Sequence, residues 1–200
     1  MEHSALFIFG LQNDFSSVGN ASIEGFENIS DKIEAISYLW TNLVAINENH
    51  PADHVSFAAC HPWRKPNQLV NIGQISQYLW PIHCVSGTMG VFNPPWLKNK
   101  NPLIVSKGLQ KEIDNFSAFD ASNLATPSLS EYLKNQQITH LYFAGFPLEY
   151  EIKETCIDAL RLAYKVTLIS HGILSLDYNK QQFIYNELLS MGANIIPYPV

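Results

Sequence analysis

The chain has 200 residues, of which 46% are hydrophobic and 15% charged, and its formal net charge at pH 7 is −6. This length and composition predict one globular domain, residues 1–200, with a substantial core, and they exclude a disordered chain. The acidic balance argues against nucleic acid as a partner. No apolar run reaches the roughly 18 residues that a membrane span needs.

The N-terminal segment and the cysteines bear on the compartment. MEHSALFIFG contains an acidic residue and has no basic region ahead of its apolar run, which argues against a secretory signal. The three cysteines are an odd number without paired spacing, so we expect reduced thiols and not disulfides. These features predict a cytoplasmic protein.

Strands and helices alternate along the chain. Short apolar runs predict buried strands at 5–11, 43–47, 101–108, 138–145, 165–172 and 193–197. Helical patterns lie at 29–40, 128–137, from about Tyr150 onward, and at 179–192. The alternation predicts an α/β fold of three layers, α/β/α, with a six-stranded parallel sheet and helices on both faces.

Three predicted helix ends carry a recognisable cap. Ser30 is a candidate N-cap of the first helix, and Ser128 or Ser130 of the second. Gly192 suits the position just after the last helix.

The stretch 48–101 differs from the rest of the chain. It has little periodicity and is rich in histidine, proline and tryptophan, including Trp63, Trp80 and Trp96. Segments of this length without regular structure are usually functional or disordered. We expect a functional region that holds a metal and a substrate.

Metal-ligand types gather where this stretch begins. In ENHPADH, Glu48 and His50 follow the second strand, alternation places them on the same side, and a turn at Pro51 would return His54. His83 is the next candidate. A carboxylate with imidazoles suits a divalent Zn, Mn, Fe or Ni ion, while the alternative is that these are ordinary polar loop histidines.

A second candidate site is GFPLEYEIKE, where the fourth strand turns into a helix. Such a turn, at the end of a parallel strand, is a usual place for a nucleophile. Here it contains Glu151 and neither cysteine nor serine.

Five stretches resemble, in order, the nicotinamidase/pyrazinamidase branch of the isochorismatase-like hydrolases. They are FIFGLQNDF (7–15), ENHPADHVSFA (48–58), WPIHCVSGTMG (80–90), VSKG with DNFSAFD (105–120) and HLYFAGFPLEYEIKETCIDAL (140–160). The resemblance implies an amidase that converts nicotinamide to nicotinate. It also implies a cysteine nucleophile, an aspartate that moves protons, a lysine, a bound divalent metal and a small pyridine carboxamide ligand. Relatives often form oligomers, so a homo-oligomer is compatible with the sequence.

The resemblance assigns roles to particular residues, and most of the types are retained. The metal ligands fall on Glu48, His50, His54 and His83, with glutamate in place of aspartate. The lysine falls on Lys107, the aromatic walls on Phe15 and Trp80, and the cis peptide on Phe146–Pro147.

Two positions depart from the family's pattern. The catalytic aspartate falls on Gly10, and the nucleophile falls on Glu151. Cys156 does not replace the nucleophile, because five residues of helix turn it roughly 140° away from Glu151. The two changes together keep the formal charge, since Glu151 returns the carboxylate that Gly10 removes and can neutralise Lys107.

Two functions follow from this pattern. In the first, the protein is a pseudoenzyme that keeps a metal site and an aromatic pocket and lacks cysteine chemistry, with Glu151 pairing directly with Lys107. In the second, Glu151 is a general base that activates a metal-bound water to hydrolyse an amide or an ester.

Overall fold

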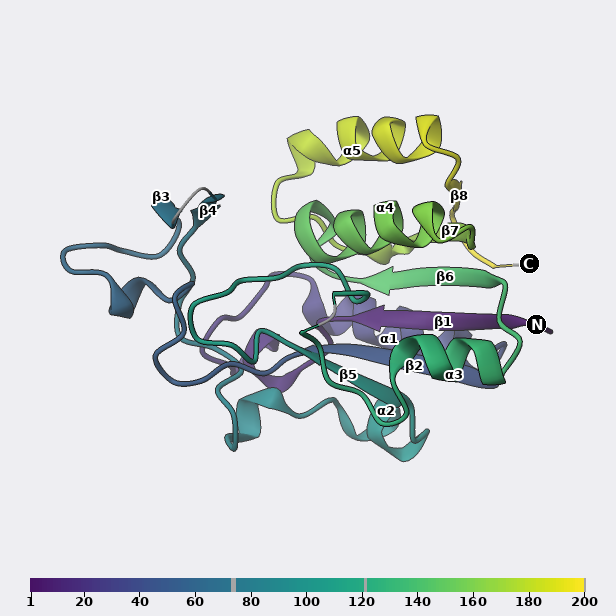
Figure 1. The fold of residues 1–200 in the computed structure, drawn as a ribbon, viewed down its shortest axis with the longest axis horizontal. Helices are drawn as coiled ribbons and strands as arrows, with labels where there is room; N and C mark the ends of the chain where they lie inside the picture. Colours follow the sequence, from purple (N-terminus) through teal and green to yellow (C-terminus); the bar gives the residue numbers. More distant parts are fainter. Residues whose placement is uncertain (73–74, 121, 200) are drawn as a thin grey trace.

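The computed structural model describes residues 1–72, 75–120 and 122–199 (Figure 1). All six predicted strands are present and form one parallel sheet in the order β5-β2-β1-β6-β7-β8. Their bounds are β1 Ser4–Phe9, β2 Asn42–Glu48, β5 Leu103–Lys107, β6 His140–Gly145, β7 Lys165–Ile173 and β8 Asn194–Ile196. The predicted three-layer α/β/α architecture is confirmed.

Helices cover both faces of this sheet. One face carries α3 (Leu129–Asn135), α4 (Lys153–Arg161) and α5 (Tyr178–Ser190). The other carries α1 (Phe26–Ser37) and the short α2 (Pro95–Asn99). No helix within the described residues is long and apolar enough to cross a membrane.

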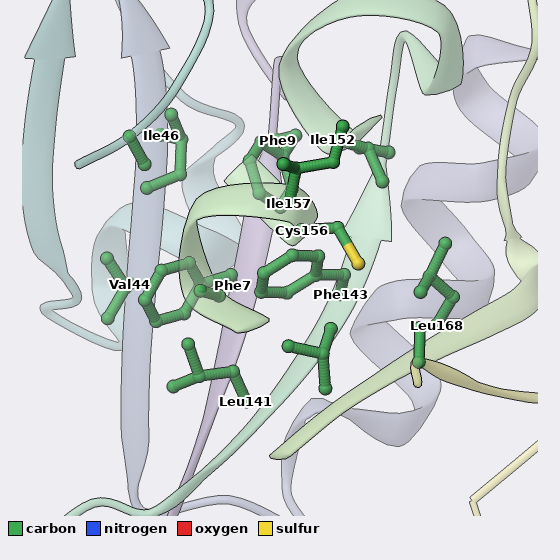
Figure 2. Close-up of a cluster of buried hydrophobic side chains, with 14 of the residues drawn as sticks. Phe7, Phe9, Val44, Ile46, Leu141, Phe143, Ile152, Cys156, Ile157 and Leu168 are labelled. Carbon is green, nitrogen blue, oxygen red and sulfur yellow. The ribbon is translucent and has the colours of Figure 1, made fainter. Parts of the chain in front are cut away.

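Strand β1 shows how the sequence builds the two cores. Phe7 and Phe9 pack under α3 to α5, whereas Leu6 and Ile8 pack against α1, because successive side chains leave opposite faces of a strand. Figure 2 shows the first of these clusters, in which Phe7, Phe9 and Phe143 lie together. Both faces of β1 are buried, as expected for a central parallel strand.

The helix caps agree with the sequence in two of three places. Ser128 caps α3 in a capping box with Glu131, and Gly192 follows α5 with a φ of 101°. The prediction for Ser30 is wrong. Helix α1 begins at Phe26 after Gly25, whose φ of 86° favours glycine, and Ser30 lies inside the helix, where its hydroxyl accepts a hydrogen bond from Trp96.

The stretch 48–101 is more regular than its sequence suggests. Besides α2, it contains an antiparallel hairpin of β3 (Leu69–Ile72) and β4 (Ile75–Tyr78). This hairpin projects beyond the sheet on the side toward which β1 and β6 point (Figure 1). Residues 73 and 74 of this stretch lie outside the described residues.

The strand order also places the site. The chain runs from β1 outward to β2 and β5 on one side, and from β6 to β7 and β8 on the other. The strand order therefore reverses between β1 and β6. In open α/β sheets, ligands bind at the carboxyl ends of the strands beside such a reversal.

Candidate active site

A cavity of about 620 Å³ opens at this place. Its wall includes the ends of β1, β2 and β6 and parts of the long stretch, and this volume is typical of small-molecule sites. Eight of the sequence-predicted site residues line the cavity: Phe15, Glu48, His50, Trp80, His83, Phe146, Pro147 and Glu151. Lys107 lies behind Glu48.

The pair Glu48 and Lys107 follows directly from strand register. The two residues are partners at the ends of β2 and β5, and Lys107 Nζ lies 2.5 Å from Glu48 Oε1. Lys107 is 1% exposed, and its ammonium also donates to the Asn115 carbonyl. Burial alone would lower the pKa of Lys107, but the carboxylates of Glu48 and Glu151 outweigh it and raise that pKa.

Glu151 lies in a turn of π-helix, Leu148–Ile152, that links β6 to α4. Such turns occur often at functional sites. Its Oε1 is 3.4 Å from Lys107 Nζ, so the expected contact exists, although Glu48 is the nearer carboxylate. Burial raises the pKa of Glu151 well above its usual value, and the nearby charge of Glu48 adds to this although Lys107 opposes it. Its Oε2 is buried and has no hydrogen-bond partner in the described part of the chain.

Two residues that the sequence reasoning left without a role hold this site together. Gln12 donates from its amide to the Glu48 carbonyl at 2.7 Å and accepts from the Glu48 backbone N–H at 2.7 Å. Asp14 accepts from the Cys84 backbone N–H at 2.6 Å and so anchors the segment that carries His83. The sequence signal for these two residues was the group of polar side chains in QNDF, directly after a predicted buried strand.

The imidazoles show how far the site fits a metal ion. His50 Nδ1 is 3.1 Å from the Gly108 carbonyl, and its Nε2 is 2.9 Å from Glu48 Oε2. Both partners are acceptors, and a neutral imidazole carries only one proton. The contact between Nε2 and Glu48 therefore calls for a second proton or a metal ion.

His83 resembles His50 in orientation, and His54 does not. The Nδ1 of His83 bonds to the Pro81 carbonyl at 2.8 Å, which leaves its Nε2 with the lone pair a ligand needs. Both ring nitrogens of His54 are engaged, with Ser56 Oγ at 2.7 Å and the Ile113 carbonyl at 3.1 Å. Among residues 1–72, 75–120 and 122–199, no three His, Cys, Asp or Glu side chains form a group arranged to hold a metal. The donor types of Glu48, His50 and His83 suit a divalent metal, but their arrangement within those residues does not form such a group.

Aromatic rings form much of the remaining wall. Phe15 meets Phe146 edge to face at 4.7 Å between ring centroids, and the Phe146–Pro147 peptide is cis, as expected. Tyr150 contacts Trp80 at 5.6 Å and Phe116 at 5.2 Å. Phe116 and Tyr150 were not predicted as wall residues, although both lie within the stretches that carry the resemblance.

Gly10 lines the cavity in a conformation that disfavours larger residues. Its φ is 65°, and a Cβ there would lie 2.7 Å from the Phe146 carbonyl oxygen and 2.9 Å from the Phe146 ring. A side chain at position 10 would therefore require Phe146 to shift.

The thiols lie away from the cavity. Cys84 and Cys156 are buried, Cys60 is exposed, and no cysteine is among the described residues that line the cavity. Cys156 is a core residue, as expected, and burial raises its pKa to about 12. A thiol held protonated in a core is not a nucleophile.

Comparisons with known proteins agree with this geometry. The isochorismatase domain is matched over residues 4–198. The nicotinamidase of Acinetobacter baylyi is 30% identical over 195 residues, which cover 96% of this chain and 91% of that protein.

Solved structures extend the likeness to three dimensions. The nicotinamidase/pyrazinamidase of Acinetobacter baumanii has a TM-score of 0.86 at 28% identity, over 98% of this chain and 96% of its own. The yeast nicotinamidase bound to the inhibitor nicotinaldehyde has a TM-score of 0.85 at 25% identity, over 98% and 100%. The chain therefore belongs to the isochorismatase family, in its nicotinamidase/pyrazinamidase branch.

Proposed function

We propose that this protein binds a small pyridine carboxamide-like ligand in its aromatic cavity and does not hydrolyse that ligand through a cysteine. One observation carries the proposal. At the turn after β6, a glutamate lies beside Lys107, and no cysteine is among the described lining residues. The yeast relative bound to nicotinaldehyde supports a pyridine compound as the ligand class.

Glu151 is a poor replacement for a thiolate. Carboxylate attack on an amide would give an anhydride, which is less stable than a thioester. The geometry also gives little support to Glu151 as a general base. One of its oxygens contacts Lys107, and the other is shielded from the solvent that would supply a water.

The proposal includes a divalent metal ion, with Glu48, His50 and His83 as its ligands. Support comes from His50, whose two nitrogens each face an acceptor, and from the backbone carbonyls that orient both rings. Such an ion would act as a Lewis acid and would favour binding of a pyridine nitrogen. Zinc binding measured by calorimetry tests this assignment, which predicts loss of binding in Glu48→Gln and retention in His54→Gln.

We also propose a cytoplasmic location, which is supported by three free cysteines.

The ligand proposal is tested by calorimetric titration with nicotinamide. We expect saturable binding that Trp80→Ala weakens, because Trp80 forms part of the cavity wall. Trp63→Ala is the matched control, since Trp63 is 99% exposed and lies outside the cavity lining. Absence of binding, or equal weakening by both variants, would contradict the proposal.

A further inference from the structure

The cavity is larger than a pyridine carboxamide requires. Its volume of about 620 Å³ lies well inside the range of drug-sized ligands, whereas nicotinamide has only nine non-hydrogen atoms. Beyond the polar end at Glu48, the wall continues through Trp80, Tyr150 and Phe116, whose rings contact one another at 5.6 and 5.2 Å. This aromatic group leaves room for a second part of the ligand.

Among the described residues that line the cavity, acidic side chains outnumber basic ones. Five acidic side chains and one lysine line the cavity: Glu48, Asp114, Glu149, Glu151, Asp177 and Lys180.

Four of these carboxylates have internal partners. Glu48 and Glu151 contact Lys107, which lies behind the wall. Glu149 accepts from the backbone N–H groups of Leu176 and Asp177, and Asp177 caps α5 and pairs with Lys180.

Asp114 has neither an ion pair nor a hydrogen bond to its buried Oδ2 within the described ranges. Its neighbour Gln77 likewise has no hydrogen bond from Nε2 in the same residues. Burial, followed by the charge of Glu48, raises the pKa of Asp114 to about 6, although the positive charges of Lys107 and His50 and the side chain of Gln77 act in the opposite direction. Its ionised form is therefore held at a cost that a nearby positive charge would relieve.

Asp114 and the aromatic group come from the same segments of chain. Asp114 precedes Phe116 by two residues, and its neighbour Gln77 lies on β4, three residues before Trp80. Aromatic faces beside a carboxylate attract organic cations, because the ring faces are electron-rich and the carboxylate supplies the opposite charge.

We propose that Asp114, Trp80, Phe116 and Tyr150 form a subsite for an organic cation, so that the preferred ligand is a pyridine that carries an ammonium group outside its ring. This inference rests on the ligand site given under Proposed function and specifies that its ligand is positively charged. Anionic pyridine carboxylates are disfavoured for the same reason.

The test compares four probes by calorimetry on the full chain. They are nicotinamide, which is neutral; nicotinate, which is anionic; 3-(aminomethyl)pyridine, which is cationic at neutral pH and keeps its ring nitrogen free; and tetramethylammonium, which has no ring. We expect 3-(aminomethyl)pyridine to bind at least about tenfold more tightly than nicotinamide. Asp114→Asn should remove most of this difference. Glu112→Gln, an exposed change in the same loop, should leave it intact.

The outcomes separate this inference from the proposed function. If nicotinamide binds and 3-(aminomethyl)pyridine binds equally or more weakly, the cation subsite is refuted and the ligand proposal stands. The subsite is also refuted if Asp114→Asn, shown by circular dichroism to be folded, keeps the full preference. If tetramethylammonium binds and neither nicotinamide nor 3-(aminomethyl)pyridine does, the pyridine pocket is refuted and the cation subsite stands. Absence of binding by all four probes refutes both.

Discussion

Replacing Gly10 by alanine tests whether the cavity wall has room for a side chain at the position where the family resemblance places an acid. The φ of 65° is a left-handed conformation that costs an L-residue roughly 1–2 kcal/mol. The added Cβ would also lie 2.7 Å from the Phe146 carbonyl oxygen, which is backbone and cannot rotate away. Overpacking of this kind costs about 1–3 kcal/mol. Together they predict that Gly10→Ala lowers the free energy of unfolding by roughly 2–5 kcal/mol.

Gly87→Ala is the control, because Gly87 has a similar φ of 78° and nothing lies within 4 Å of its added Cβ. It should lose only the conformational part, about 1–2 kcal/mol. Urea unfolding followed by tryptophan fluorescence measures both variants. Equal losses, within about 0.5 kcal/mol, would refute the steric argument. Aspartate at position 10 meets the same obstruction, so restoring the family's acid requires movement of the Phe146 segment.

Three further predictions concern the buried charges and the thiols. Lys107→Met leaves Glu48 without its cation and should cost about 3–5 kcal/mol in urea unfolding; a loss below about 1 kcal/mol would mean that the ion pair does not stabilise the fold. Folding raises the pKa of Asp114 from 3.8 to about 6, so the stability that this group contributes is fully present below pH 3.8 and is lost as the pH rises through 6. Asp114→Asn should therefore have a free energy of unfolding roughly 1–3 kcal/mol above that of the natural protein at pH 7.5, and the two should be equal near pH 3.8. A stability gain of the same size at both pH values would contradict this prediction. A thiol reagent should modify Cys60 alone in the native protein and all three cysteines in urea; rapid native reaction of a second thiol would show that a further cysteine is accessible.

Much of the fold was predictable because its signals are local. Buried parallel strands read as short apolar runs, and Ser128 and Gly192 mark their helix ends by chemistry that depends on a few neighbouring residues. Helix α1 shows the limit of such signals. Its first turn is set by packing of Phe26 and by Gly25, and the serine that suggested a start lies within the helix.

The sequence predicted which residues line the site better than it predicted which of them contact one another. Alternation along an extended chain places Glu48 and His50 on one side, and Glu48 Oε2 lies 2.9 Å from His50 Nε2. The closest partner of Lys107 could not be read from the sequence, because it depends on the register of β5 against β2. That register sets Glu48 directly opposite Lys107, while Glu151 approaches from the turn before α4 at 3.4 Å. No local sequence pattern marks Asp114, because its significance comes from the absence of an ion-pair partner among the described residues of the folded chain.

Ammonia release from nicotinamide, by purified protein supplied with zinc or manganese, tests the central claim most directly. The account predicts no release above a protein-free control, because the turn after β6 presents Glu151 and no thiol reaches the cavity within the described residues. Sustained release that a chelator and Glu151→Gln both abolish would contradict it. Such a result would identify Glu151 as a catalytic base in a metal-dependent hydrolase.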